Sequence, residues 1–583
     1  MTVSKSSVLL RACLLGAALG ASLGLRADVT WYAVDPMAET QFLPDKEPVN
    51  GLKGEPVRMV AARGEYEPGS FVLTADADLG KVDFKVGDLK SKDGAVFSAK
   101  EIDVRTVKVW YQNQNGWWSY FADDSFKLCP ELLLHDEDLV KVDEKKMANY
   151  ARLTEKDGRV RYHWLTPPKD VENRLEDSEG GRIDDAFFSM KPNFMDAETF
   201  KGATVEKNRF KQFLLTVHVP KETKPGLYAG EIVLVQRKGG KKLGAVPVVL
   251  RVLPFELPEP CTFGDCHKPF LTWFCSYIGY GGVMDVNGGD RDLATKQLKA
   301  IALNFIRHNN TIHLIGFDGE EEFSRANGAD MLHRHYGGMW LTSDKAEIRY
   351  DARRKRERML KVGGEGAQGY LSWGDEYQLN TLRKIRDMVK IYHEQGFGFT
   401  VNSGSGYSAG GYLADLWWPP KFPDERSKDV AEHFNNLGGK GYFGWYACQH
   451  VGAENPAFNR RQYGLAPYRA GLSCNYNYAH HLQGWNDRAS IVYRPMMFVY
   501  GVGNGCLDTI QWEGFREGID DIRYATLLKQ LAMPLVDSKN IDGRYVAKKA
   551  LQYLSDLDHD NYDLTTVRLE MIRHILKLQE VSK

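Results

Sequence analysis

An adjacent pair of carboxylates lies directly after one of the most apolar segments of the chain. Residues 369–374 have the composition of a strand, Asp375 and Glu376 follow, and a clear helical pattern begins at Leu379. Neighbouring strand residues point to opposite faces, so both acids reach one site only where the strand has ended. Two carboxylates held together resist joint ionisation, so one stays charged while the other keeps its proton. Cleavage of a glycosidic bond requires this division of labour.

The same pair also has a purely structural interpretation. Asp375 is a suitable N-cap for the helix that follows, and Glu376 would stabilise the first turn of that helix. Caps are common and catalytic pairs are rare, so the local sequence leaves this alternative open.

Aromatic and polar side chains gather near the ends of later apolar segments. The candidate substrate-binding residues are Trp445, Tyr446, Tyr476, Tyr478, Trp485 and Asp487. Flat aromatic faces stack on sugar rings, and polar groups bind sugar hydroxyls. Core packing accounts for many aromatic residues in any protein, but their concentration near strand ends favours a sugar site.

Two other patterns suggest different chemistry. Residues 406–410 match G-x-S-x-G with Ser408 as the nucleophile, but a Gly/Ser-rich stretch separates them from the preceding strand. His333 and His335 lie in a charged segment with no carboxylate at ligand spacing, and the adjacent pair at 480–481 would point to opposite faces if extended. We therefore expect surface or hydrogen-bonded histidines. No P-loop or dinucleotide fingerprint follows a strand. The sequence therefore predicts neither a cofactor nor a metal site.

The elements that must position these residues divide the chain into parts. Residues 28–258 carry short β-rich segments separated by Gly and Pro turns, which indicate an antiparallel β-sandwich. A polar insert at about 120–210 interrupts them, and we expect long loops there. Residues 259–535 alternate apolar segments with amphipathic helices, as in a (β/α)8-like barrel. Residues 536–583 predict a C-terminal helical segment.

Eight apolar segments are the predicted barrel strands. They are 269–276, 311–317, 369–374, 397–402, 441–448, 472–479, 495–502 and 506–512. Catalytic groups of such barrels lie at the C-terminal ends of strands, which is where Asp375 and Glu376 fall. The last two segments are close together for a helical crossover, so an open doubly wound sheet is the alternative.

Composition and the N-terminus bear on partners and location. The 583 residues include 76 Lys and Arg against 77 Asp and Glu, so no basic surplus favours nucleic acid. Residues 1–27 show the charged, apolar, small-residue order of a secretory signal peptide, which predicts a secreted or periplasmic protein. We expect no membrane span after it. Seven cysteines follow the signal, and an odd number favours mostly free thiols.

Three longer motifs resemble glycoside hydrolase family 123. Residues 61–68 (AARGEYEP) and 224–231 (KPGLYAGE) resemble segments of the β-sandwich of that family. Residues 512–524 (WEGFREGIDDIRY) are similar to the motif that closes its barrel. The resemblance implies a β-sandwich, a (β/α)8-like barrel and β-N-acetylgalactosaminidase activity on a glycan. It also places Asp375 and Glu376 at the catalytic pair of the family.

The resemblance further implies substrate-assisted catalysis with retention of configuration. Glu376 would protonate the leaving oxygen while the 2-acetamido oxygen of the substrate attacks the anomeric carbon, and Asp375 would orient the acetamido N–H. Glu513 and Glu517 are assigned to helix structure, with Arg516 as an ion-pair partner. The alternatives are a glycosidase of the same fold acting on a different glycan and a non-catalytic carbohydrate-binding protein. A serine hydrolase using Ser408 is the least favoured.

Overall fold

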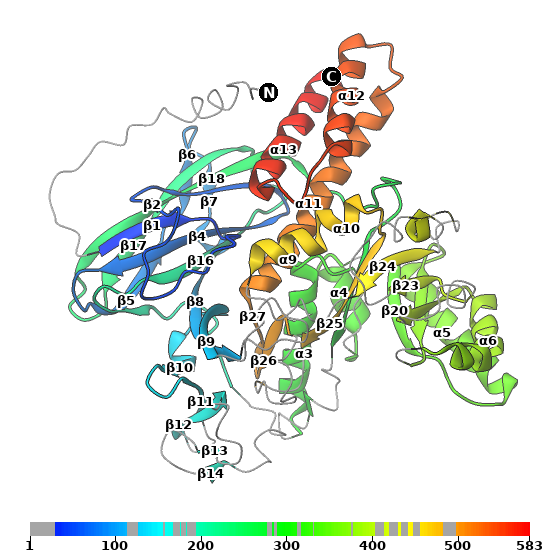
Figure 1. Cartoon of the computed structure of the whole chain (residues 1–583), viewed down its shortest axis with the longest axis horizontal. Helices are drawn as coiled ribbons and strands as arrows, with labels where there is room; N and C mark the ends of the chain where they lie inside the picture. Colours follow the sequence, from blue (N-terminus) through cyan, green and yellow to red (C-terminus); the bar gives the residue numbers. More distant parts are fainter. Residues whose placement is uncertain are drawn as a thin grey trace.

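The structure is a computed structural model in which two β-sheets, a parallel sheet with its helices, and a group of C-terminal helices follow one another along the chain (Figure 1). It describes residues 29–583 apart from 114–125, 155–157, 167–174, 177–181, 184–193, 277–282, 285–288, 312–315, 330, 375–376, 403–412, 419–428, 433–435, 437–440, 447–454, 482–484 and 486–496.

Two sheets make up the N-terminal β part. The six-stranded sheet runs in the order β2 (Leu52–Lys53), β1 (Val29–Val34), β4 (Tyr66–Ala75), β16 (Lys211–His218), β8 (Ile102–Asn113) and β9 (Phe126–Leu134). The seven-stranded sheet runs in the order β15 (Ala203–Val205), β5 (Gly80–Val86), β17 (Gly226–Gln236), β18 (Lys242–Glu256) and β3 (Val57–Arg63), with β6 (Leu89–Ser91) and β7 (Val96–Phe97) beside it. The described pairings are antiparallel, except that β3 and β18 are parallel.

One hydrophobic core joins these two sheets. Phe71 and Leu215 of the six-stranded sheet and Ile232 and Leu250 of the seven-stranded sheet belong to the same buried cluster. Alternation explains this, because every second residue of a strand points to the same face.

The insert at about 120–210 contains strands, so the prediction of long loops there is wrong. Its described residues include β9, a three-stranded antiparallel sheet and a short hairpin. These further strands are β10 (Val140–Asp143), β11 (Ala148–Thr154), β12 (Val160–Thr166), β13 (Leu175–Glu176) and β14 (Arg182–Ile183). Ala151 and Leu165 are buried against a core that includes Tyr500 and Leu507 from far along the chain. Residues from elsewhere in the sequence complete the core of the insert, which is why the sequence of the insert alone does not predict it.

The second part is a curled sheet of seven parallel strands. Its order is β19 (Leu271–Ser276), β25 (Cys474–His481), β24 (Tyr442–Tyr446), β23 (Leu416–Trp418), β22 (Phe397–Asn402), β21 (Gln368–Ser372) and β20 (His333–Gly338). The helices of this part are α3 (Arg291–Arg307), α4 (Glu320–Ala326), α5 (Lys345–Gly363), α6 (Leu379–Glu394), α9 (Pro456–Tyr463) and α10 (Leu465–Arg469). In chain order, β20 follows β19 after the predicted strand 311–317, and most of that segment lies outside the described residues. The described strands therefore give a curled parallel sheet and not a complete eight-stranded barrel.

Five of the predicted strands coincide with β19, β21, β22, β24 and β25, and the differences are informative. Segments 495–502 and 506–512 are not strands of the parallel sheet, because β26 (Val499–Val502) and β27 (Gly505–Asp508) form an antiparallel hairpin. Their short separation in sequence is the reason. Strand β20 was not predicted, because its charged residue Arg334 resembles a loop residue; the structure buries Arg334 against Glu320 at 3.1 Å.

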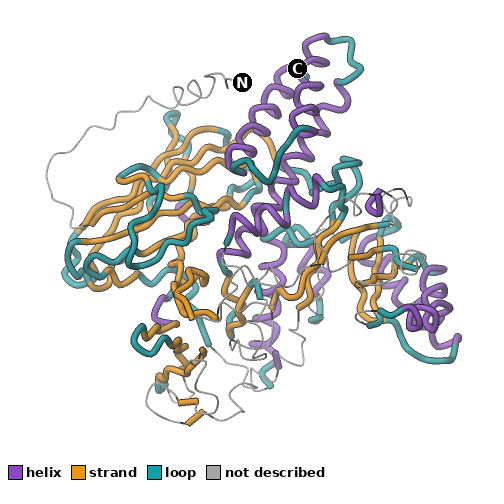
Figure 2. Tube along the Cα trace, in the orientation of Figure 1, coloured by secondary structure: helices purple, strands orange, loops and turns teal. Residues whose placement is uncertain are grey.

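The C-terminal residues are helical, as predicted. Helices α11 (Ile510–Ala532), α12 (Ile541–Ser555) and α13 (Leu564–Val581) lie side by side (Figure 2). Helix α11 begins at the N-cap Thr509 and packs closely on α9. Gly514 and Gly518 permit this contact, since a Cβ at Gly518 would lie 2.5 Å from the carbonyl oxygen of Arg460.

A buried ionic cluster, here called the ionic joint, connects the β part to the C-terminal helices. It consists of Glu65, Glu67, Arg460, Glu517, Asp521 and Arg568. Arg568 of α13 lies 2.6 Å from both Glu517 and Asp521 of α11 and 3.2 Å from Glu67 of β4. Two of the three sequence motifs, residues 61–68 and 512–524, therefore meet in space.

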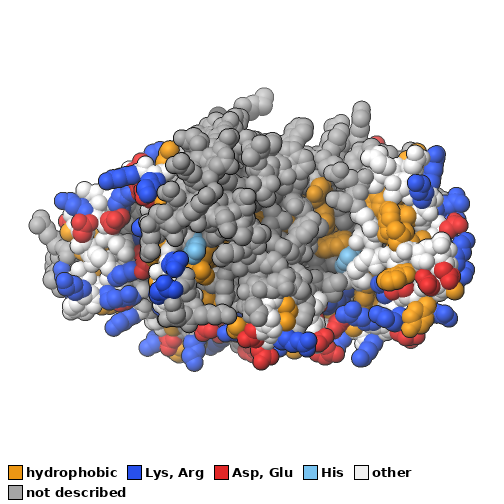
Figure 3. All heavy atoms as spheres, turned by 90° about the horizontal axis from the view of Figure 1, so that it is seen from below, with side chains coloured by type: hydrophobic (Ala, Val, Ile, Leu, Met, Phe, Trp, Pro, Cys, Tyr) orange, Lys and Arg blue, Asp and Glu red, His pale blue; other side chains and the backbone are white. Residues whose placement is uncertain are grey.

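The surface carries charges of both signs, and the described cysteines form no disulfides. Acidic and basic side chains are interspersed at both ends of the face in Figure 3. Cys129, Cys261, Cys266, Cys474 and Cys506 are free thiols. None of the helices within the described ranges is long and apolar enough to cross a membrane.

Candidate functional site

The predicted catalytic pair follows the C-terminal end of β21. Asp375 and Glu376 lie outside the described residues, but the chain on either side is held in place. The hydroxyl of Tyr377 accepts the backbone N–H groups of Trp373 at 2.9 Å and Gly374 at 2.7 Å. Tyr377 is itself buried, at 2% exposure. The two residues that flank the pair are thus anchored to each other.

Four rings lie together on one face of the curled sheet and form what we call the mouth. They are Trp273 of β19, His335 of β20, Tyr446 of β24 and Tyr476 of β25. Ring centroids of Trp273 lie 4.3 Å from His335 and 5.4 Å from Tyr476, and Tyr446 lies 5.2 Å from Tyr476. Trp273, His335 and Tyr446 are only half-buried. Such a partly open aromatic surface suits the apolar face of a sugar.

His335 is a neutral hydrogen-bonding group in the mouth. Its Nδ1 accepts the N–H of Gly337 at 3.3 Å, so Nε2 carries the proton and donates to the Ser372 hydroxyl at 3.2 Å. Burial lowers the pKa of His335 to about 3. The expectation of a hydrogen-bonded histidine is confirmed for His335. Sequence reasoning missed its place in the mouth, although its i, i+2 spacing from His333 matches one face of a strand.

Tyr446 and Tyr476 are the two predicted substrate-binding residues that the structure brings together. Trp445 neighbours Tyr446 in sequence but points to the opposite face of the sheet, as strand alternation requires. It is 1% exposed, donates its indole N–H to Asn475 at 2.9 Å and stacks on Tyr463 at 5.2 Å. Trp445 is therefore a core residue with no ring face open to a sugar.

Trp485 is also a core residue, in the hydrophobic cluster that contains Trp110 and Tyr500. It is 3% exposed, packs on Trp110 and Tyr500, and donates its indole N–H to the carbonyl of Gly501 at 2.6 Å. This position does not suit the predicted stacking role. Three further predicted or rival site groups lie outside what the structure describes: Asp487, Ser408 and the side chain of Tyr478.

The assignment of Glu513 and Glu517 to helix structure is confirmed. Arg516 lies 2.5 Å from Glu513 and 3.7 Å from Glu517, and the side chains of all three are at most 2% exposed. Glu517 also belongs to the ionic joint.

Comparison with solved structures matches the whole architecture. A family 123 glycoside hydrolase from Clostridium perfringens, studied for glycolipid glycan hydrolysis, aligns over 94% of this chain and 99% of its own, with a TM-score of 0.56 and 11% identity. The chain has the fold of a family 123 glycoside hydrolase. A β-glucuronidase from Ruminococcus gnavus, solved with uronic isofagomine, covers 85% of this chain and 96% of its own at 10% identity, but its TM-score is only 0.26. No protein-family model and no curated protein matches the sequence.

The likeness to the family 123 structure is one of fold. At 11% identity the likeness establishes the architecture and not the substrate. Function must therefore be argued from the side chains of the candidate site. In this chain those are the described mouth residues and the adjacent acids that follow β21.

Proposed function

We propose that this chain is a secreted, retaining glycoside hydrolase that acts on β-linked 2-acetamido sugars, with β-N-acetylgalactosaminides as the substrate class. The observation that carries the proposal is the adjacent Asp375-Glu376 pair three residues beyond the end of β21, in a chain with the family 123 fold. The aromatic mouth on the same sheet supports it.

Glu376 is the proposed general acid and base. It begins protonated and donates its proton to the glycosidic oxygen as the bond to the anomeric carbon breaks. The carbonyl oxygen of the 2-acetamido group bonds to that carbon and forms an oxazoline. Water then attacks the anomeric carbon, gives its proton to Glu376 and reopens the ring. Two inversions leave the configuration retained, without a nucleophile from the protein.

Asp375 is the proposed orienting carboxylate. It accepts a hydrogen bond from the acetamido N–H and offsets the positive charge that develops on that group during ring closure. Its negative charge also raises the pKa of the adjacent carboxyl, which keeps Glu376 protonated for the first step.

The mouth residues are the proposed sugar-binding surface. Trp273 provides a ring for the apolar face of the sugar, while the hydroxyls of Tyr446 and Tyr476 are donors for the acetamido carbonyl. His335 is neutral and fixed in one tautomer, so it holds the Ser372 hydroxyl without adding charge to the site.

Hydrolysis of an aryl β-N-acetylgalactosaminide by the mature protein tests the proposal. We expect Glu376→Gln and Asp375→Asn to lower kcat by about 10²- to 10⁴-fold, the range for loss of general acid–base or charge-stabilising groups. Glu394→Gln, the same change at an exposed residue of α6, should leave kcat unchanged. Wild-type levels of activity in both site variants would exclude the pair from catalysis.

A second substrate separates the mechanism from the activity. The matching aryl β-galactoside has a 2-hydroxyl in place of the acetamido group and cannot form an oxazoline. We expect no turnover of this substrate, and equal rates on both compounds would exclude substrate assistance. An enzyme inert on the acetamido substrate but active on another glycan would keep the fold and change the substrate class.

Secretion has a separate test. The N-terminal residue of the exported protein, read by mass spectrometry, should lie near Asp28. An exported or cellular protein that retains residues 1–27 would exclude a cleaved signal peptide.

A further inference from the structure

A polar cavity of about 430 Å³ lies between the β part and the helices α3 and α11. Its walls include Asp103 and Arg105 of β8, Asn304 of α3, His308 at the end of α3, Asp508 of β27 and Glu513 of α11. The exposed residues Lys100 and Glu198 also line it, so the cavity reaches solvent. None of the four mouth rings is among its lining residues.

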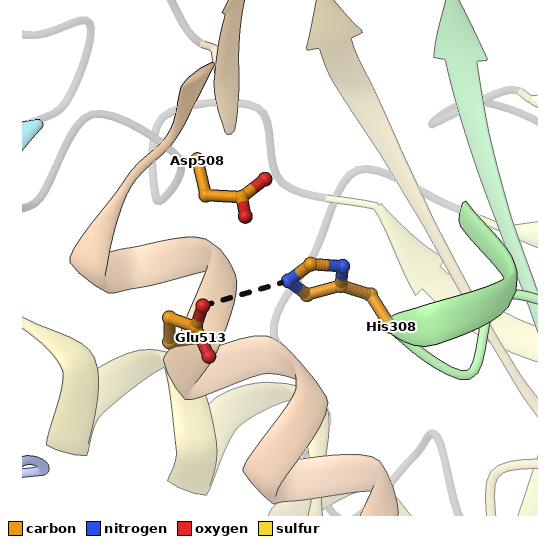
Figure 4. A group of neighbouring side chains, drawn as sticks. All are labelled: His308, Asp508 and Glu513. Atoms are coloured by element: carbon orange, nitrogen blue, oxygen red, sulfur yellow. Dashed lines mark ion pairs between the residues drawn. The ribbon is translucent and has the colours of Figure 1, made fainter. Parts of the chain in front are cut away.

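Three potential metal ligands from three separate elements converge on this cavity. His308, Asp508 and Glu513 each offer one ligand atom, and these atoms all lie within 4.8 Å of one another (Figure 4). His308 is 3% exposed and Glu513 is fully buried. An imidazole nitrogen with two carboxylate oxygens is a donor set that transition metals accept.

The tautomer of His308 points to a ligand. Its Nδ1 lies 2.8 Å from the carbonyl oxygen of Asn304 and must donate to it, so in the neutral imidazole Nε2 is the nitrogen with the lone pair. Nε2 has no hydrogen-bond partner among the described residues, and the nearest carboxylate oxygen, of Glu513, is 4.0 Å away. A metal-binding histidine has this arrangement, with one nitrogen fixed by a backbone carbonyl and the other free to coordinate.

A neighbouring aromatic ring holds the imidazole of His308 in place. The ring stacks on Trp512 with centroids 4.8 Å apart. Nε2 of His308 faces the carboxylates of Asp508 and Glu513, and neither of them forms a hydrogen bond with it.

Arg105 competes with a metal ion for this position, because it already forms ion pairs with both carboxylates. It lies 2.6 Å from Asp508 and 2.5 Å from Glu513. Asn304 donates to the other oxygen of Asp508, and Arg516 lies 2.5 Å from the other oxygen of Glu513. These contacts orient the carboxylates, as supporting residues do around metal sites, but none of them satisfies Nε2 of His308.

We propose that His308, Asp508 and Glu513 bind one divalent transition-metal ion, Zn²⁺ or Mn²⁺. The imidazole ligand selects against Ca²⁺ and Mg²⁺, which prefer oxygen ligands alone. The ion connects α3, β27 and α11 next to Arg105 of β8. Its role is to stabilise the packing of the two parts, since it shares no residue with the mouth.

Isothermal titration of EDTA-treated, full-length protein with ZnCl₂ or MnCl₂ tests the proposal. We expect one ion per chain, a rise in Tm with metal concentration, and no comparable binding of Ca²⁺ or Mg²⁺. His308→Gln removes one ligand and should weaken metal binding at least about tenfold. Even changes to residues that only support metal ligands lower metal affinity by about 10- to 100-fold. His218→Gln is the matched control, because His218 lines the same cavity but pairs with Glu101 at 2.9 Å. No saturable binding by wild type, or equal binding by His308→Gln, would overturn the proposal.

A measurement on the wild type avoids any folding defect of a variant. Anomalous diffraction from crystals soaked in MnCl₂ should give a peak at about 2.0–2.3 Å from Nε2 of His308 and from an oxygen of each carboxylate. Peaks only at other histidines, or no peak at this position, would overturn the proposal.

Discussion

The mouth of the parallel sheet and the ionic joint use polar side chains in opposite ways. In the mouth, His335 is neutral and lies against the half-buried ring of Trp273. In the joint, Arg568 is buried and contacts several carboxylates, two of them at 2.6 Å. The joint pairs buried charges of opposite sign with one another, whereas three of the four mouth rings are only half-buried.

The comparison shows what the sequence motifs report. Residues 61–68 and 512–524 meet in the joint. There Glu65 accepts hydrogen bonds from the hydroxyl of Tyr524 at 2.7 Å and from the backbone N–H of Ala62 at 2.6 Å. A buried network permits few substitutions because each charge needs its partner. These motifs are therefore a signature of how the parts pack, whereas the proposed catalytic pair after β21 is only two residues long.

The largest expected effect is loss of the central cation of the joint. Arg568→Met leaves Glu67, Glu517 and Asp521 without this partner, and removing one member of a buried ion pair costs about 3–5 kcal/mol. We expect a much lower urea midpoint, or failure to fold. Arg573→Met is the control, because Arg573 pairs with Glu570 near the surface and should cost at most about 1 kcal/mol. Equal midpoints for the two variants would contradict a structural role for the joint.

A smaller effect should follow from filling the space between α9 and α11. A Cβ at Gly514 would collide with the carbonyl of Pro456, so Gly514→Ala should destabilise the protein by about 1–3 kcal/mol. Gly543→Ala is a control of opposite sign, since its Cβ would contact Asn540 at 3.4 Å, and alanine favours the helix by about 0.5–1 kcal/mol. Denaturant unfolding measures both, and a stabilised Gly514→Ala would contradict the close contact.

The joint should also respond to pH. Burial raises the pKa of Glu65 to about 8, with a further contribution from Asp520. The folded state then holds a proton that the unfolded state releases near pH 4.5, so Glu65 makes stability fall as pH rises from about 4.5 to 8. The slope from one group is at most about 1.4 kcal/mol per pH unit. Urea unfolding from pH 5 to 8 should show a shallower decline for Glu65→Gln than for wild type, and identical slopes would exclude the shift.

The smallest effect on stability should come from the mouth. Tyr446→Phe removes one half-buried hydroxyl, and we expect kcat/KM on the acetamido substrate to fall about tenfold, or about 1.4 kcal/mol, with little change in Tm. Tyr463→Phe is the opposite case, because its buried hydroxyl accepts a hydrogen bond from Asn477 behind the sheet. It should lower Tm and leave kcat/KM nearly unchanged. If Tyr446→Phe lowered Tm and Tyr463→Phe lowered kcat/KM instead, the roles assigned to the two faces of the sheet would be wrong.

Much of the fold could be predicted from local patterns. The helix predicted from Leu379 onward is α6, and its apolar positions at helical spacing, such as Leu382 and Ile385, are buried. Most of the parallel strands were found because strands buried on both faces are continuously apolar. Strands β20 and β23 and the strands of the insert were missed. The charged Arg334 made β20 resemble a loop, and the apolar residues of the insert pack on residues such as Tyr500 that are remote in sequence.

The candidate site was predictable only in part. Tyr446 and Tyr476 were identified from their positions near strand ends, and they do lie together. Trp445 and Trp485 fit the same pattern but are core residues, because residue type alone does not state which face of an element is open. Trp273, His335 and Ser372 were missed, since their proximity depends on the order of strands in the sheet.

By itself the sequence determined the alternation of strands and helices, the helical C-terminus and the adjacent acids after an apolar strand, because these depend on the properties of neighbouring residues. Only the tertiary structure decided that β26 and β27 form a separate hairpin, that Glu65 and Tyr524, 459 residues apart, share one buried network, and that His308 faces Asp508 and Glu513. These outcomes depend on which remote segments share a desolvated contact. Burial makes an unpaired charge or polar group costly, so these contacts depend on partners that no local pattern encodes.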